Sequence, residues 1–318
     1  MSVTIPNGVM NIGDGAFACC TALKNIKIPN SVISIGKSAF ACCIALKNVN
    51  IPNSVTRIGE CAFWGCQTLK FKEYNNGLYL GNKENPYASL IKAKSEYITT
   101  CKIKETCKCI EYGAFSGCEE LTSIIIPNNI TSIGNRVFYG CTKLTSVTIP
   151  NSVTSIGDEA FYGCKKLTSV TIPNSVTNIE KYAFFGCIGL TNIIIGNNIK
   201  YIEGNTFDVC KIKHKPKDNI AYKGLNVDMT CRDFQYEEGK TYTCNKSKLC
   251  GYGFHACLNP LDCFNYYADK DTVYHEVILE DRTKEIGGDS KTCGKKITIG
   301  RRLTIQEMVS IFNELNKG

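Results

Sequence analysis

Cysteine and histidine gather near the carboxyl-terminal end of the chain, at Cys250, His255, Cys257 and Cys263. Thiolate sulfur and imidazole nitrogen are ligands that zinc prefers, so these residues are candidates for a metal site. A cysteine and a histidine could also form a nucleophile and its base, but neighbours on one strand rarely have the required orientation. The spacing matches no familiar zinc motif. We therefore expect buried thiols beside a hydrogen-bonded histidine, with no metal, no cofactor and no catalytic residue.

The composition favours a folded protein in a reducing compartment. Of the 318 residues, 43% are hydrophobic, 21% are charged and 20 are cysteines. No stretch approaches the roughly 18 apolar residues of a membrane span, and residues 1–6 lack the features of a secretion signal. The cysteines are then expected as free thiols, because disulfides are rare in the cytoplasm. We expect a cytoplasmic protein, or one exposed on a cell surface or virion if the sequence is a fragment.

A regular repeat organises the first two thirds of the chain. A phenylalanine recurs every 23 residues, with one step of 52 between Phe63 and Phe115. The series is Phe17, Phe40, Phe63, Phe115, Phe138, Phe161, Phe184 and Phe207. Self-similarity at such a period is typical of solenoids. The long step is two periods plus six residues, so one further turn must be enlarged and lack the phenylalanine.

Each repeat contains one short strand that a proline ends. The pattern Leu-x-x-Val/Ile-x-Ile, as in Leu144–Ile149, places apolar side chains on one face and Thr, Ser, Asn or Lys on the other. Pro150 follows and interrupts the backbone ladder because it lacks an N–H group. Val153, Ile156 and Phe161 then point inward. One repeat cannot bury this face alone, so the repeats must stack.

These motifs resemble the BspA-like subclass of leucine-rich repeats. The resemblance covers residues 1–213 and rests on the repeated Ile-Pro-Asn-Ser-Val and Ala-Phe-x-x-Cys motifs, which occur together between Leu144 and Cys164. It implies a leucine-rich-repeat parallel solenoid of 23-residue repeats with one short strand per repeat. The repeat pattern and the lack of a catalytic motif favour a non-enzymatic protein whose concave strand face binds another protein or a glycan.

A second column consists of cysteines, three residues after each phenylalanine. Its members are Cys20, Cys43, Cys66, Cys118, Cys141, Cys164, Cys187 and Cys210. Equivalent positions of stacked repeats project in parallel, which suits small buried side chains and not disulfides. We expect a column of free, buried thiols.

The enlarged turn lies at residues 69–97. Residues 75–81 followed by 88–91 are typical of a hairpin, which we expect to project from the solenoid. Insertions on such scaffolds often carry binding residues. The hairpin is therefore either a contact site or a tolerated spacer.

The outward face of the predicted strands changes from basic to neutral along the chain. Its candidate binding residues are Lys24, Lys27, Lys47, Lys70, Lys72, Thr122, Thr145, Thr148, Thr168, Thr171 and Thr191. Residues 1–215 hold 22 Lys and Arg against 14 Asp and Glu, whereas residues 216–318 hold 15 of each. Such a face favours an acidic protein partner, with a glycan or a merely solvated face as alternatives. We expect no nucleic acid, because the lysines lack interleaved aromatic residues.

The first repeat has no polar cap, since Val3 and Ile5 already occupy strand positions. Terminal repeats normally carry a capping face. We therefore expect that the open end either self-associates with another subunit or continues a longer array.

The period ends after residue 213, and a basic linker at 214–219 precedes a second domain at 220–318. Strand signals lie at 221–224, 253–257, 273–279 and 296–299. One helix begins at Asn259-Pro260 and runs to Tyr267, and a capping box at Thr304 begins another that ends near Leu315. We expect a small α+β domain of unknown function.

Residues 220–313 resemble an uncharacterised domain of bacteriophage and prophage proteins, through residues 221–224, 231–242 and 253–262. This resemblance implies a phage-associated protein and no particular activity. The order of a Gly-Phe strand, a helix ending at Tyr267 and a strand holding Glu276 is similar to ADP-ribosyltransferases. One alternative is therefore that this domain is an enzyme, either a nucleotide-dependent transferase or a zinc-dependent hydrolase, with the repeats as targeting scaffold. A structural or assembly component is the other alternative.

Overall fold

The computed structural model describes residues 1–207, 219–231, 234–245, 254–267, 271–282 and 291–315. They form two compact units, Met1–Phe161 and Tyr162–Gly318. The first holds most of the repeats, and the second holds the last repeats together with the carboxyl-terminal domain. Of the predicted linker, residues 214–218 lie outside the described part of the chain, as do Cys210 and Cys250.

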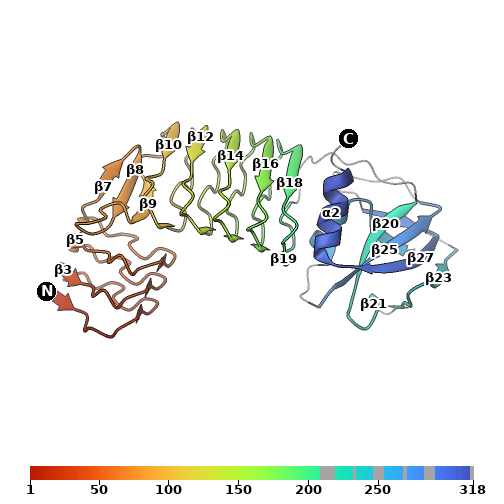
Figure 1. Ribbon diagram of the computed structural model, residues 1–318, viewed down its shortest axis with the longest axis horizontal. Coiled ribbons are helices and arrows are strands. Elements are labelled where there is room, and N and C mark those ends of the chain that lie inside the picture. The colour runs from red at the N-terminus through yellow and green to blue at the C-terminus, as the bar shows by residue number, and fades with distance from the viewer. Residues whose placement is uncertain (208–218, 232–233, 246–253, 268–270, 283–290, 316–318) are drawn as a thin grey trace. The chain divides into compact units, whose positions relative to one another are not determined.

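The repeats form a parallel β-solenoid of about nine turns, as the period predicts. In Met1–Phe161 the leucine-motif strands are β1 (Ser2–Thr4), β3 (Asn25–Lys27), β5 (Asn48–Val49), β10 (Thr100–Lys102), β12 (Ser123–Ile125) and β14 (Ser146–Thr148). Val3 lies opposite Ile26, and Ile26 lies opposite Val49, so each strand pairs with the equivalent residues of the next repeat. Figure 1 shows β10, β12 and β14 side by side.

A second row of short strands follows the proline turns. Its members in this unit are β2 (Asn11–Ile12), β4 (Ser34–Ile35), β6 (Arg57–Ile58), β11 (Cys109–Ile110), β13 (Ser132–Ile133) and β15 (Ser155–Ile156). Parallel pairing of β2 with β4 and of β4 with β6 aligns the buried residues Ile12, Ile35 and Ile58. Buried residues therefore recur at fixed positions and share one continuous core.

The phenylalanines stack into a column inside the solenoid. Ring centroids are 5.3 Å apart for Phe17 and Phe40 and 5.1 Å apart for Phe138 and Phe161. In the second unit Phe184 stacks on Phe207 at 5.5 Å. One ring therefore fills the interior of each turn that carries the phenylalanine.

The predicted column of free thiols is confirmed where the structure describes it. The described cysteines are all free, and Cys66 and Cys141 are buried. The Cys66 thiol donates to the Phe40 carbonyl at 3.1 Å, and the Cys141 thiol donates to the Phe115 carbonyl at 3.2 Å. Burial raises the pKa of Cys66 to about 12. The thiol therefore keeps the proton that bonds it to the preceding repeat.

The enlarged turn contains three antiparallel strands, β7 (Lys72–Tyr74), β8 (Gly77–Leu80) and β9 (Ser89–Ala93). Asn75 and Asn76 connect the first two with positive φ angles of 43° and 65°, which asparagine tolerates in a two-residue turn. The expectation that this segment projects is wrong, because Tyr79, Leu80 and Leu90 are buried. They are buried because β9 pairs in parallel with β11 and takes the place of a regular turn.

The second unit begins with the last repeats. They contribute β16 (Ser169–Ile172) and β18 (Asn192–Ile195) to one row, and β17 (Asn178–Ile179) and β19 (Tyr201–Ile202) to the other. Both pairs are parallel, so the repeat geometry of the first unit recurs here.

The carboxyl-terminal domain is built on an antiparallel sheet, as predicted for a small α+β fold. The strand order is β23 (Thr241–Thr243), β27 (Lys296–Leu303), β25 (Val273–Glu280), β20 (Ile220–Leu225), β24 (Phe254–Cys257) and β26 (Lys291–Gly294). The other elements are the hairpin of β21 (Thr230–Cys231) and β22 (Phe234–Gln235), the 3₁₀ helix η1 (Pro260–Asp262), α1 (Cys263–Tyr266) and α2 (Ile305–Leu315). None of the described helices is long and apolar enough to cross a membrane.

Both predicted helix starts are confirmed. The Asn259 side chain accepts a hydrogen bond from the Leu261 N–H at 3.0 Å. The Glu307 carboxylate accepts from the Thr304 N–H at 2.8 Å, and the Glu307 N–H donates to the Thr304 hydroxyl at 3.1 Å. Such reciprocal capping fixes the start of α2.

Helix α2 packs against the last leucine-motif strand. The Asn313 amide donates to the Ile195 carbonyl at 2.7 Å and accepts from the Ile195 N–H at 3.1 Å. Gln306 donates to the Ile199 carbonyl at 2.8 Å. In the described part of the second unit, β18 pairs with one strand, β16. The helix therefore satisfies backbone groups that an exposed edge would leave open.

Replacing Asn313 with alanine should uncouple α2 from β18. Ile195 is buried, so its N–H and carbonyl would each lose a partner, and the free energy of unfolding should fall by about 1–3 kcal/mol. Urea unfolding and hydrogen exchange of the Ile195 amide measure this effect. Ser310→Ala on the same helix is the control, because its 3.5 Å bond to Asn197 is exposed. Equal effects of the two changes would contradict this role for Asn313.

Candidate functional site

The predicted binding residues are all exposed, nine of them in or just before leucine-motif strands, whereas Lys70 precedes β7 and Lys72 lies in it. The eleven exposed side chains are Lys24, Lys27, Lys47, Lys70, Lys72, Thr122, Thr145, Thr148, Thr168, Thr171 and Thr191. Four lie inside strands, and the others precede a strand by one or two residues. The motif leucine, for example Leu23, points into the core. Its successor in the extended chain therefore points outward.

Three lysines occupy the same position of successive repeats, and we call them the lysine column. They are Lys24, Lys47 and Lys70. The Lys47 N–H donates to the Lys24 carbonyl at 3.1 Å, and the Lys70 N–H donates to the Lys47 carbonyl at 3.0 Å. Neighbouring strands lie about 4.8 Å apart. The backbone therefore holds these three side chains in one row.

No acidic side chain of the described chain neutralises this basic surface. The ion pairs of the described residues involve none of Lys24, Lys27, Lys47, Lys70 and Lys72. Some other cations of the same unit are paired, as Lys37 is with Glu60 at 2.7 Å. Unpaired like charges in one row repel each other and attract an anionic partner. The lysine column, with Lys27 and Lys72 beside it, can therefore bind carboxylate groups of another molecule.

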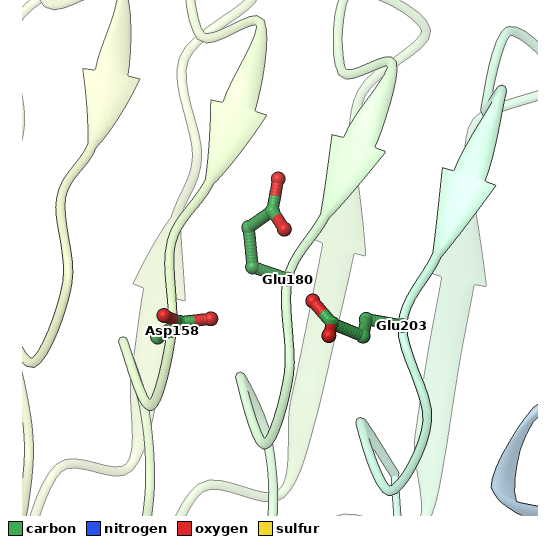
Figure 2. A group of neighbouring side chains, drawn as sticks. All are labelled: Asp158, Glu180 and Glu203. Carbon is green, nitrogen blue, oxygen red and sulfur yellow. The ribbon is translucent and has the colours of Figure 1, made fainter. Parts of the chain in front are cut away.

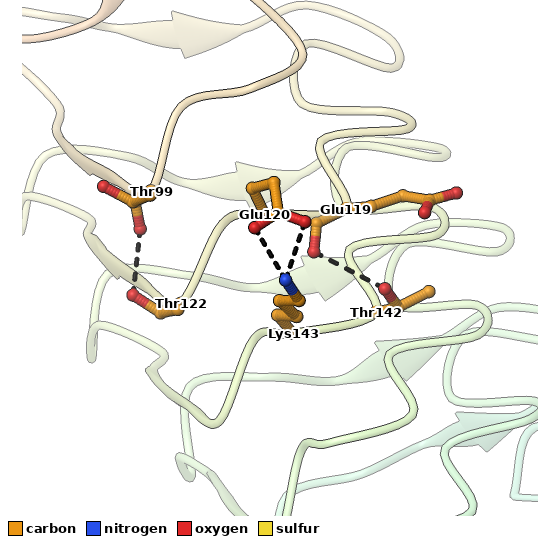
Figure 3. Close-up of polar contacts among 6 residues, drawn as sticks. All are labelled: Thr99, Glu119, Glu120, Thr122, Thr142 and Lys143. Carbon is orange, nitrogen blue, oxygen red and sulfur yellow. Dashed lines mark hydrogen bonds and ion pairs between the residues drawn. The ribbon is translucent and has the colours of Figure 1, made fainter.

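The threonine positions are hydrogen-bonded within the array. The Thr122 hydroxyl donates to the Thr99 carbonyl at 3.0 Å (Figure 3), and the Thr145 hydroxyl donates to the Thr122 carbonyl at 3.3 Å. In the second unit the Thr191 hydroxyl donates to the Thr168 carbonyl at 3.5 Å. These hydroxyl protons are used in hydrogen bonds between repeats, so the hydroxyl oxygens can only accept hydrogen bonds from a ligand.

In the repeats of the first unit that carry the threonine positions, charged side chains of neighbouring repeats form ion pairs. Figure 3 shows the Lys143 ammonium bonded to both carboxylate oxygens of Glu120, each at 2.7 Å. The Thr142 hydroxyl donates to the Glu119 carbonyl at 3.4 Å. The lysine column differs from this arrangement, because its three lysines form no such pair among the described residues.

A cluster that the sequence interpretation missed consists of Asp158, Glu180 and Glu203 (Figure 2). One carboxylate oxygen of each lies within 4.8 Å of the others. The sequence contained a signal for this cluster, because each of the three acidic residues follows the Ile of the second strand row by one or two positions. Carboxylates also gather in this way without an ion, so we assign no metal to them.

The cysteines and histidine near the carboxyl-terminal end do not form a metal centre in the described part of the chain. His255 and Cys257 lie in β24, and Cys263 begins α1. The carboxylate cluster is the one described group of three or more His, Cys, Asp or Glu residues whose ligand atoms lie within 4.8 Å. Cys250 lies outside the described residues.

The most unusual side chain of this domain is Lys223 in β20, which the sequence interpretation did not single out. It is 2% exposed, and its ammonium donates to the His255 carbonyl at 2.9 Å. It also lies over the Tyr236 and Tyr267 rings, at 5.4 and 5.6 Å from their centroids. Burial lowers the pKa of Lys223. These contacts satisfy the amine inside the domain, so we assign it a structural role.

Comparison with known families separates the two parts of the chain. The model of the BspA type leucine rich repeat region matches residues 1–83 and 93–213 in six copies. A domain of unknown function (DUF7666) matches residues 219–311. No curated protein matches the chain.

Several solved structures are similar to the repeats. A leucine rich cell surface protein from Faecalibacterium prausnitzii is 33% identical, with a TM-score of 0.37, over 60% of this chain and 59% of that protein. A leucine-rich repeat protein from Bacteroides ovatus is 26% identical, with a TM-score of 0.30, over 66% and 73%. The pneumococcal vaccine antigen PcpA is 24% identical, with a TM-score of 0.41, over 66% and 55%. The chain thus spans little more than half of the first and third proteins.

Proposed function

The chain belongs to the BspA type leucine rich repeat family, and on this premise we propose that it is a non-enzymatic interaction module that binds an acidic partner protein. The lysine column, with Lys27 and Lys72 beside it, is the proposed contact surface. The observation that carries the proposal is that these five exposed lysines form no ion pair among the described residues.

The distribution of charge supports the same surface. The whole excess of positive charge lies in residues 1–215, whereas residues 216–318 are balanced. Opposite charges on two surfaces accelerate association and select the partner. Carboxylates suit the lysines better than sugar hydroxyls do, because ammonium groups only donate hydrogen bonds and favour anions.

Removing the lysine column should weaken binding to an acidic probe. The variant carries Lys24→Gln, Lys47→Gln and Lys70→Gln, and the probe is a peptide of ten glutamates measured by calorimetry at low salt. We expect an affinity loss of about tenfold, because each exposed charge contributes modestly and three act together.

The matched control is a dispersed variant with the same change in net charge. It carries Lys83→Gln, Lys165→Gln and Lys200→Gln, three exposed lysines that lie away from the column. Its affinity should stay within about twofold of the unaltered protein. Equal losses in both variants would show that only net charge matters and would defeat the proposal.

A further inference from the structure

The column of phenylalanine rings is interrupted at the enlarged turn. In regular repeats the phenylalanine N–H donates to the residue before the next phenylalanine, as Phe17 does to Ala39 at 2.8 Å. The Ala93 N–H donates to the Ala114 carbonyl at 2.7 Å in the same relation. Ala93 therefore stands where a phenylalanine ring would be, and the interior beside Phe63 is left partly unfilled.

The side chain of Glu111 is buried beside this gap. The first three repeats have glycine at its position, and a Cβ on Gly59 would lie 2.4 Å from the Lys37 nitrogen. In the turn before Glu111, strand β9 pairs with β11, and the Glu111 side chain is buried. The backbone N–H groups of Ala62 and Phe63 lie near the carboxylate and act against the rise in its pKa that burial causes. Glu111 thus lies against the backbone of the third repeat, at the point where the column of phenylalanine rings is interrupted.

One oxygen of this carboxylate has no partner. Glu111 is 4% exposed, and no described residue donates a hydrogen bond to its Oε2 atom. A buried carboxylate without a counter-charge is strongly unfavourable. Burial accordingly raises the pKa of Glu111 to about 8. The site therefore gains free energy from any cation that reaches Oε2.

A cavity of about 460 Å³ lies beside Glu111, which is one of its lining residues. Its walls include Phe63, Trp64, Phe71, Lys92, Glu111 and Tyr112. Glu111 is the one carboxylate among the lining residues, and the Lys92 ammonium lies 5.5 Å from the centroid of the Phe71 ring. Aromatic faces attract cations through their ring quadrupoles. The cavity thus combines one carboxyl group, one lysine and several aromatic walls.

We propose that this cavity binds an alkylammonium group, carried by a free amine or by a lysine side chain of another protein. The ammonium would bond to Oε2 of Glu111, and its methylene groups would contact the aromatic walls. Calcium or magnesium fits less well, because these ions require several oxygen ligands and the cavity supplies one carboxylate. This inference is independent of the lysine column and goes beyond the proposed function.

The single tryptophan of the chain, Trp64, lines the cavity and reports on its occupancy. Titration of the full chain with n-butylammonium should therefore change the tryptophan fluorescence saturably. The neutral control, n-butanol, has the same number of heavy atoms and should bind at least tenfold more weakly. Nα-acetyl-lysine methylamide distinguishes the sources: binding equal to that of n-butylammonium indicates a lysine side chain, and weaker binding indicates a free amine.

The dependence on pH identifies the group that binds the cation. Affinity for n-butylammonium should rise about 30-fold between pH 6.5 and 9, because only ionised Glu111 pairs with an ammonium and its pKa is about 8. Of the other facing groups, Lys92 is a cation, and burial raises the pKa values of Cys61, Cys66, Cys109 and Tyr112. These thiols and the phenol therefore stay neutral over most of this range. A flat profile would overturn the proposal.

Two variants complete the test. Glu111→Gln keeps a carbonyl oxygen near the Ala62 and Phe63 N–H groups and should lose at least tenfold in affinity for n-butylammonium. Phe71→Leu keeps the carboxylate and should lose several-fold. Unchanged affinity in Glu111→Gln, or equal binding of n-butanol and n-butylammonium, would show a cavity for neutral ligands and overturn the proposal.

Discussion

Glu111→Gln should make the protein more stable above pH 8 and change its stability little below pH 4.5. The folded state raises the pKa of Glu111 from 4.5 to about 8, so it binds the proton more tightly than the unfolded chain does. The free energy of unfolding of the unaltered protein therefore falls as the pH rises through this window. Glutamine does not titrate and avoids this loss, which reaches roughly 5 kcal/mol at most.

Urea unfolding at pH 5, 7 and 9 measures the difference. The gain of Glu111→Gln over the unaltered protein should be small at pH 5 and largest at pH 9. Glu119→Gln is the matched control, because Glu119 is exposed and its replacement should give a small and constant difference. A Glu111→Gln protein that is less stable at pH 9 would show that a cation or an undetected donor already pairs with the carboxylate.

Phe138→Ala should lower the free energy of unfolding by about 3–5 kcal/mol. Phe138 is fully buried, and its ring stacks on Phe115 at 5.5 Å and on Phe161 at 5.1 Å. Alanine would remove both ring contacts and leave a cavity in a rigid stack of turns, which can collapse only in part. Chemical denaturation monitored by circular dichroism measures the loss.

Phe17→Ala is the control for this prediction. Phe17 begins the column, stacks on Phe40 alone and is half-buried. Its replacement should cost clearly less, about 1–2 kcal/mol. Equal losses at both positions would mean that stacking on two sides adds nothing and would contradict the column as the stabilising core.

The regular part of the solenoid could be predicted because every turn must bury apolar side chains at the same positions of the repeat. Spacing alone located the rings from Phe17 to Phe207 and the buried thiols, since stacked turns must bury the same positions. The exposure of Lys24 and Thr145 followed from the alternation of a strand after a buried leucine.

The features that occur once in the chain could not be predicted in the same way. Glu111 replaces the glycine of the first three repeats, but Glu180 and Glu203 do so as well in later repeats, and of these three only Glu111 is buried. The sequence did not indicate this burial, because it depends on β9 taking the place of a regular turn. The bond between Asn313 and Ile195 joins residues 118 positions apart, and nothing in a helical asparagine indicates such a partner. The hairpin was expected to project because its apolar residues had no visible place in the repeat.

The salt dependence of binding to the glutamate decapeptide tests the central claim most directly. Logarithmic plots of affinity against salt concentration should be steep and parallel for the unaltered protein and the dispersed control, because both retain the lysine column. The slope for Lys24→Gln, Lys47→Gln and Lys70→Gln should be clearly shallower, since fewer ion pairs are screened. A column variant that keeps the slope of the unaltered protein would contradict the assignment of the binding surface to these lysines.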